Sequence, residues 1–175
     1  MRFLGLSGSL RAASTNTALL KAFADHAPEG ITVDVFGGMG DLPLFSPDLE
    51  ADTPQSVLRL AEKVDACDGL LISCPEYAHG IPGAFKNALD WLVSRFEIPG
   101  KPVMLVHAST RNAYLRDHLR EVLKTISCRL YPGPEFEVHL IKKDEDEIRN
   151  ILAEPEMRAA MRAKLEDFRR FAAEA

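Results

Sequence analysis

Cysteine is scarce in this sequence, and the few thiols are poorly placed for a crosslink or a metal site. The 175 residues include only Cys67, Cys74 and Cys128, an odd number without a Cys-x-x-Cys pair. Disulfide frameworks need paired cysteines, and a zinc site needs closely spaced ligands. We therefore expect reduced thiols and no bound metal. Reduced thiols are typical of the cytoplasm, which is the compartment we expect.

Long apolar runs and clusters of basic residues are missing as well. No segment approaches the roughly 20 apolar residues of a membrane span, and residues 1–10 have the pattern of a strand, not of a signal peptide. The net charge is −5 without a basic patch, so nucleic acid and anionic membranes are poor partners. With 46% hydrophobic residues and no Pro/Ser-rich linker, residues 1–175 are expected to form one domain.

Strand and helix patterns alternate along the chain. Apolar strands without polar alternation are typical of a parallel sheet that helices cover on both faces. Segment 37–53 is long, and its apolar stretch 42–45 predicts that it folds back onto the body or onto a partner. Thr53 and Pro54 are expected to be the N-cap and first residue of a helix. The predicted strands are 2–7, 31–36, 70–74, 102–107 and 136–141, and the predicted helices are 15–27, 53–66, a segment after Pro82, 112–126 and two pieces on either side of Pro155.

Small and polar residues follow the first predicted strand, in segment 8–17. Strand, small-residue loop and helix is the order in which backbone N–H groups and a helix N-terminus cradle an anion. The segment has neither the lysine of a nucleoside-triphosphate P-loop nor a Gly-x-Gly-x-x-Gly pattern. A plain strand-to-helix turn, with Ser14 or Thr15 as N-cap, is the alternative. Arg11 would supply positive charge, and short polar side chains come from Ser9, Ser14, Asn16 and Thr17.

A second loop of the same kind follows the strand that ends near residue 74. Segment 74–83 contains two prolines and two glycines, which stiffen a loop and let its backbone approach a flat ligand, and Tyr77 adds an aromatic ring. A functionless Pro-Gly turn is the alternative. Polar and aromatic residues gather at the strand ends, however, and ligands of open parallel sheets bind where such loops leave neighbouring strands. The two loops therefore predict a pocket.

The two segments together resemble a known family. Gly8-Ser9-Leu10-Arg11, followed later by Pro75-Glu76-Tyr77 and by Ile81-Pro82-Gly83 with 86–92, resembles the NAD(P)H-dependent FMN reductases, which include quinone, azo-dye and chromate reductases. The resemblance spans about the first two thirds of the chain. It implies an α/β fold of flavodoxin-like type, a doubly wound five-stranded parallel sheet of strand order 2-1-3-4-5 with helices on both faces.

The resemblance also implies a cofactor and a reaction. FMN would be bound, and NADPH or NADH would reduce it at N5 before a quinone, azo compound or similar small acceptor takes the electrons in a ping-pong scheme. Because the chemistry belongs to the flavin, no catalytic side chain is expected. Glu76 is then expected to structure its loop instead of acting as a base. The implied FMN phosphate contacts are Ser9, Arg11, Ser14, Asn16 and Thr17, and the implied contacts along the isoalloxazine ring are Pro75, Glu76, Tyr77, Ala78 (through its backbone) and Ser109.

Two features depart from the family. Ala78 stands where the family has asparagine, and segment 107–114 contains no glycine where the family has a glycine-rich loop. Side chains at 109–111 are therefore expected to crowd the flavin edge. His107 is expected to form a polar wall or lid, and His79 to lie in a loop near the substrate. Cys74, beside the second loop, is expected to be a small buried residue, with a redox role as the alternative.

The region of Trp91, Leu92 and Phe96 resembles the part of the family that packs across a dimer interface, so a homodimer or homotetramer is expected. An ordinary core position for Trp91 is the alternative. Two other classes of function stay open. A flavodoxin-type electron carrier would be more acidic and would hold the ring between two aromatic side chains. A binding or regulatory protein with weakened or lost flavin binding would explain the glycine-free third segment.

Overall fold

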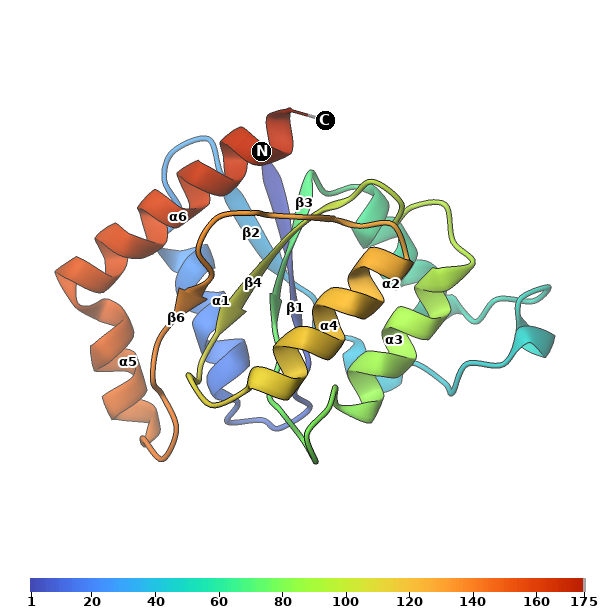
Figure 1. Ribbon diagram of the computed structural model, residues 1–175, viewed down its shortest axis with the longest axis horizontal. Coiled ribbons are helices and arrows are strands. Elements are labelled where there is room, and N and C mark those ends of the chain that lie inside the picture. Colours follow the sequence, from blue (N-terminus) through green and yellow to red (C-terminus); the bar gives the residue numbers. More distant parts are fainter. Residues whose placement is uncertain (175) are drawn as a thin grey trace.

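A parallel sheet forms the centre of the molecule (Figure 1), as a computed structural model of the chain shows for the residues it describes, 1–174. The strand order confirms the predicted 2-1-3-4-5 topology. Strand register pairs Leu4 with Leu70 and Leu71 with Met104. Nearly all residues of the three central strands are buried, because helices cover the sheet on both faces. In spatial order the strands are β2 (Thr32–Val35), β1 (Arg2–Ser7), β3 (Gly69–Ser73), β4 (Pro102–His107) and β5 (Arg129–Leu130).

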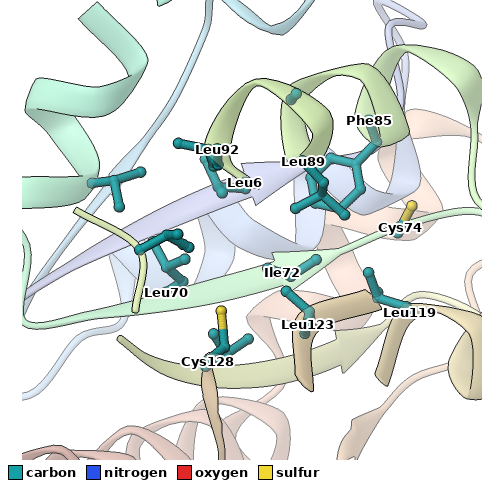
Figure 2. Packing of buried hydrophobic residues seen from close by; sticks show 14 of the residues in the cluster. Leu6, Leu70, Ile72, Cys74, Phe85, Leu89, Leu92, Leu119, Leu123 and Cys128 are labelled. Atoms are coloured by element: carbon teal, nitrogen blue, oxygen red, sulfur yellow. The ribbon is translucent and has the colours of Figure 1, made fainter. Parts of the chain in front are cut away.

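Helices form a layer on each face of the sheet (Figure 1). Successive strand residues point to opposite faces, so Leu70 and Ile72 pack on one side and Leu71 on the other. Figure 2 shows the first of these sides, where leucines of α3 and α4 cover β1 and β3. That side is covered by α2 (Gln55–Asp65), α3 (Gly83–Val93) and α4 (Ala113–Thr125), and the other by α1 (Thr15–Asp25), α5 (Glu145–Ala153) and α6 (Pro155–Ala173).

The outer edge of the sheet differs from the prediction. In place of one strand over 136–141, β5 pairs with Pro102 and Val103, and β6 (Phe136–Glu137) pairs separately with Val106 and His107. Pro132 and Pro134 lie between the two short strands. Proline donates no backbone hydrogen bond, so the ladder along β4 is interrupted there. The chain leaves the sheet after β5 and rejoins it beside the carboxyl end of β4.

Segment 37–53 folds back onto α3, as predicted. Its short 3₁₀ turns are η1 (Met39–Asp41) and η2 (Pro47–Leu49). Asn87 accepts from the Phe45 N–H at 2.8 Å and donates to the Pro43 carbonyl at 2.9 Å, while Trp91 Nε1 donates to the same carbonyl at 2.8 Å. Trp91 and Leu92 are consequently buried in this chain's own core. The prediction that they face a partner is wrong for these two side chains, whereas Phe96 is 83% exposed.

The start of α2 also differs from the prediction by one position. Pro54 occupies the N-cap, and the helix begins at Gln55. The hydroxyl of Thr53 does not cap the helix but donates to the Glu50 carbonyl at 2.8 Å. Proline at the N-cap leaves no side-chain cap, and Thr53 closes the preceding turn instead.

Candidate functional site

Three loops leave the carboxyl ends of the neighbouring strands β1, β3 and β4 at one edge of the sheet. We call residues 8–14 the first loop, 74–82 the second loop and 108–112 the third loop. The strand order reverses between β1 and β3, which makes this edge a topological switch point. The Gly8 N–H donates to the Ser73 carbonyl at 2.9 Å. A Cβ at position 8 would lie 2.2 Å from Cys74 Sγ, so only glycine lets the first two loops pack this closely.

The first loop is held in place by its own hydroxyl groups. Ser7 Oγ accepts from the Ser9 N–H at 3.3 Å and from Thr17 Oγ1 at 2.8 Å. Ser14 caps α1 by accepting from the Thr17 N–H at 3.3 Å, so the N-cap is Ser14 and not Thr15, the other candidate from the sequence. Asn16 is buried, and its Oδ1 accepts from the Ser73 hydroxyl at 3.0 Å. The structure therefore uses the side chains of Ser14, Asn16 and Thr17 to shape the loop and to join it to β3.

The outer side of the first loop offers hydrogen-bond donors and positive charge. Arg11 is exposed, and Ser9 Oγ fixes the turn by accepting from the Arg11 N–H at 3.3 Å. The first N–H groups of a helix have no intrahelical acceptor, and they carry the positive end of the helix dipole. Residues 15–18 at the start of α1 carry only hydroxyl, amide and methyl side chains. This set of donors fits a phosphate group.

The second loop turns back on itself at its tip. Tyr77 and Gly80 exchange two backbone hydrogen bonds, of 3.1 and 2.9 Å, across the turn residues Ala78 and His79. Both turn residues adopt positive φ, 49° and 59°, which is the conformation of a type I′ turn. Side chains with a Cβ disfavour this region by roughly 1–2 kcal/mol per residue. The turn leaves the Tyr77 ring 54% exposed beside the other loops.

Glu76 joins the second loop to α4. Its Oε2 accepts from the backbone N–H of Leu115, in the first turn of α4, at 3.0 Å, and its Oε1 lies 3.5 Å from His79 Nδ1. A carboxylate at a helix N-terminus satisfies a free donor and interacts favourably with the dipole. His79 also packs edge-on against Tyr114, with ring centroids 4.4 Å apart. These contacts support the expected structuring role of Glu76.

His107 is 1% exposed, so the prediction of a ligand-facing wall or lid is wrong. The ring lies beneath the third loop, with Nε2 2.8 Å from Glu135 Oε2 and Nδ1 3.0 Å from Asn112 Nδ2. Burial raises the pKa of the Glu135 carboxyl, but hydrogen bonds from His107 and Arg120, together with the charge of Arg120, outweigh it and lower that pKa below its usual value. A hydrogen bond from Arg116 lowers the pKa of Glu137 as well. This ionic cluster replaces the expected polar wall.

The third loop places Ser109 at the edge where the first two loops meet the sheet. Its hydroxyl accepts from the Arg111 N–H at 3.0 Å, and its carbonyl accepts from Arg116 Nη2 at 3.3 Å. Arg111 itself is exposed. Arg116 and Glu135 were not predicted from the sequence as residues that fix the third loop. The helical spacing of residues 112 and 116 was the one available signal, and nothing indicated that segment 131–135 returns to this edge.

The cysteines do not contribute reactive groups. Cys67, Cys74 and Cys128 are free and buried, and burial raises the pKa of the Cys74 thiol, which disfavours the reactive thiolate. This supports the expectation of a small buried residue at position 74. Among the described residues, no group of three His, Cys, Asp or Glu side chains is arranged to hold a metal ion. No helix within residues 1–174 is both long and apolar enough to cross a membrane.

Comparison with known proteins connects this geometry to a family. Residues 1–143 match the family model described as NADPH-dependent FMN reductase. The chain is 32% identical over 153 residues to a quinone reductase of Escherichia coli (strain K12), covering 83% of this chain and 81% of that protein. It is 37% identical over 147 residues to a 2-hydroxy-1,4-benzoquinone reductase of Burkholderia sp., covering 81% and 78%.

A solved structure agrees with these matches over almost the whole chain. The flavoenzyme NAD(P)H:(acceptor) oxidoreductase FerB from Paracoccus denitrificans superposes with a TM-score of 0.80 at 25% identity, covering 99% of this chain and 97% of that one. The flavodoxin-like arrangement therefore extends through α5 and α6, beyond the residues that match the family model.

Proposed function

This chain belongs to the NADPH-dependent FMN reductase family, and from that premise we propose that it reduces quinones with electrons from NAD(P)H. It is an NAD(P)H-dependent flavin oxidoreductase of flavodoxin-like fold. Bound FMN supplies the redox chemistry, accepting a hydride and passing two electrons to a second substrate. Support for a quinone as that substrate comes from the names of two relatives, a quinone reductase and a 2-hydroxy-1,4-benzoquinone reductase.

The first loop carries this proposal, because it presents donors and no carboxylate at the switch point of the sheet. Arg11, the hydroxyl of Ser9 and the first N–H groups of α1 would hold the phosphate of FMN. Ser14, Asn16 and Thr17 would act by keeping those N–H groups in place, since their side chains already bond within the protein. The phosphate would therefore meet one flexible cation and a rigid set of backbone donors.

The second and third loops would face the flavin ring. Pro75, Tyr77, the backbone at Ala78 and Ser109 would line the ring, because their loops follow β3 and β4, which pair side by side next to β1. Glu76 would stabilise this wall by its bond to α4, leaving the reacting atoms to the cofactor and substrates. We propose that NAD(P)H and quinone use the same pocket in turn, which gives ping-pong kinetics.

We propose that residues 1–175 form one FMN-binding domain that assembles into a homodimer or homotetramer in the cytoplasm. Leu44 and Phe96 are each 83% exposed, and Val93 is exposed as well. Val93 ends α3 and Phe96 follows it, while Leu44 belongs to segment 37–53, which the Pro43 carbonyl bonded to Trp91 and a 2.6 Å bond from Ser94 Oγ to Glu50 hold against this end of α3. We propose that these apolar side chains form one exposed patch, a feature that marks protein interfaces. The reduced, buried thiols support the cytoplasmic assignment.

Titration of the apoprotein with three flavins tests the cofactor assignment. FMN is expected to bind more tightly than riboflavin and FAD, because the first loop fits a terminal phosphate monoester. Hydrogen bonds to charged groups contribute about 1.5–3 kcal/mol each, so loss of the phosphate should weaken binding by at least about tenfold. Equal affinity for riboflavin would contradict the assignment of the first loop.

A further inference from the structure

We infer that Asn112, His107 and Arg116 are positioning residues, which hold the glycine-free third loop in the shape that receives the flavin. The identity of the ligand, FMN, rests on the proposed function of this site. The hydrogen bonds among the positioning residues are observed in the structure. The side chains come from three places: His107 ends β4, Asn112 precedes α4, and Arg116 lies one turn into α4. Asn112 and Arg116 were not among the site residues expected from the sequence, and His107 was expected as a wall or lid instead of a buried positioning residue.

Hydrogen bonds fix which way the Asn112 amide points. Its Oδ1 lies 2.7 Å from Arg116 Nε, which can only donate, so this atom must be the amide oxygen. The amide nitrogen then faces His107 Nδ1 at 3.0 Å. Exchange of the two amide atoms would place N–H groups against the N–H of Arg116. The arginine thus selects one orientation of the asparagine.

The asparagine in turn selects the protonation pattern of the buried histidine. Because Asn112 donates to Nδ1, that nitrogen must carry a lone pair, and the ring proton resides on Nε2. Nε2 lies 2.8 Å from Glu135 Oε2, which accepts this proton's hydrogen bond. Glu135 also accepts from Arg120 Nη2 at 2.6 Å. Every polar atom of the buried ring is satisfied in one arrangement only.

Arg116 transmits this arrangement to the third loop. Besides Asn112 it donates to the Ser109 carbonyl at 3.3 Å, and it pairs with Glu137 and, at 3.5 Å, with Glu135. Asn112 stands at the N-cap of α4 but makes no capping bond. The cap is supplied by Glu76 of the second loop, which leaves Asn112 free to bond His107 and Arg116. The third loop, which has no glycine, is therefore positioned by side-chain hydrogen bonds from α4. A glycine-rich loop would instead be shaped by its own backbone conformation.

Two substitutions at position 112 separate the parts of the network. Asn112→Leu removes both hydrogen bonds, leaves the ring nitrogen unpaired, and is expected to raise the dissociation constant for FMN by about tenfold or more. Asn112→Asp keeps the acceptor for Arg116 and is expected to stay within about threefold of the native affinity. In that variant carboxylates face both ring nitrogens of His107, so Nδ1 should carry a proton in addition to Nε2. Glu121→Gln, an exposed change on the same helix, is the matched control and should alter affinity by less than about twofold.

Nitrogen NMR of the histidine rings reports which ring nitrogen of His107 carries the proton. This quantity depends on the hydrogen bond from Asn112 and not merely on whether the protein is folded. In the native protein the His107 signals, assigned with a His107→Gln variant, should show a neutral ring protonated at Nε2. Amide hydrogen exchange of residues 108–112 in apoprotein should be faster in Asn112→Leu than in the native chain and the Glu121→Gln control. Both measurements are made on protein without flavin, so their results test the positioning role even if the protein does not bind FMN.

The outcomes distinguish this inference from the proposed function. A native ring protonated at Nδ1, or exchange and FMN affinity unchanged in Asn112→Leu, would overturn the positioning role. Native protein that binds no FMN, but shows the Nε2 proton and the faster exchange in Asn112→Leu, would overturn the cofactor assignment and keep the positioning of the loop. Should Asn112→Leu fail to fold, Arg116→Lys removes the bond to Ser109 with the charge retained, and it must give the same faster exchange.

Discussion

The first and third loops both form a short turn at the carboxyl end of a strand, but different kinds of side chain stabilise the two turns. The first loop uses hydroxyl groups from residues 7–17, which bond to neighbours a few positions away. The third loop depends on charged and ring groups, with His107, Arg116 and Glu135 brought together from β4, α4 and the segment before β6.

The difference has consequences for what each loop can offer a ligand. The first loop uses neutral groups for its own structure, so Arg11 and the start of α1 stay available to an anion. Beneath the third loop Arg116 and Arg120 are paired with Glu135, whereas Arg111, the charged residue of the loop itself, is exposed. We therefore expect changes in the first loop to act on FMN affinity directly, and changes in the ionic cluster beneath the third loop to act through geometry and pH.

Removal of the Arg11 side chain should have the largest effect. Arg11→Ala is expected to raise the dissociation constant for FMN by about 10- to 100-fold, since hydrogen bonds to charged groups are worth about 1.5–3 kcal/mol. Turnover should return in part when excess FMN is added, because the chemistry itself is untouched. Fluorescence titration and steady-state rates measure both quantities. Lys21→Ala, an exposed change on α1, is the control; a rate that stays low at saturating FMN would give Arg11 a different role.

Filling the contact between the first and second loops should cost stability. Gly8→Ala would place a Cβ against Cys74 Sγ, and overpacking of this kind lowers the free energy of unfolding by about 1–3 kcal/mol. Combination with Cys74→Ala removes the clashing sulfur and should recover most of the loss. Urea unfolding of the two single variants and the double variant checks this coupling. Additive effects would show that the two loops are not in the described contact.

Acid should weaken the third loop through Glu135. Its folded pKa is lowered, so its ionised form contributes stability above the unfolded pKa of about 4.3. That contribution is lost as pH falls through the folded pKa. Between about pH 5 and pH 3 the native chain should therefore lose more free energy of unfolding than Glu135→Gln. Urea unfolding at a series of pH values measures the slopes, and equal slopes for the two proteins would refute the ionic anchoring.

Glu76→Gln should have the smallest effect. The amide oxygen can still accept from the Leu115 N–H, so turnover at saturating FMN is expected to stay within about threefold of the native value. A general base at this position would instead be worth about 10²–10⁴ in rate. Steady-state kinetics with NADPH and a benzoquinone separate the two roles.

The same contrast explains how much could be predicted from the sequence. The family resemblance implied the strand order, and the structure confirms it. Local patterns and apolar residues indicated an N-cap at Ser14 or Thr15 and a return of segment 37–53 to the body or to a partner, and the structure has the cap at Ser14 and the segment on the body. The split edge strand was missed because Pro132 and Pro134 interrupt pairing with a strand almost thirty residues earlier. His107 was misplaced because its partner Glu135 is distant in sequence, and no periodic pattern in the sequence indicates a buried hydrogen bond between the two side chains. Which groups meet across the sheet edge is decided by tertiary packing.

Initial-rate kinetics of the FMN-loaded protein test the central claim most directly. NADPH and 1,4-benzoquinone are varied together, and consumption of NADPH is followed by its absorbance. Use of one pocket by the two substrates in turn predicts quinone-dependent oxidation with parallel double-reciprocal lines. Protein that is saturated with FMN but oxidises neither NADPH nor NADH would contradict the account, and intersecting lines would contradict the sharing of one pocket.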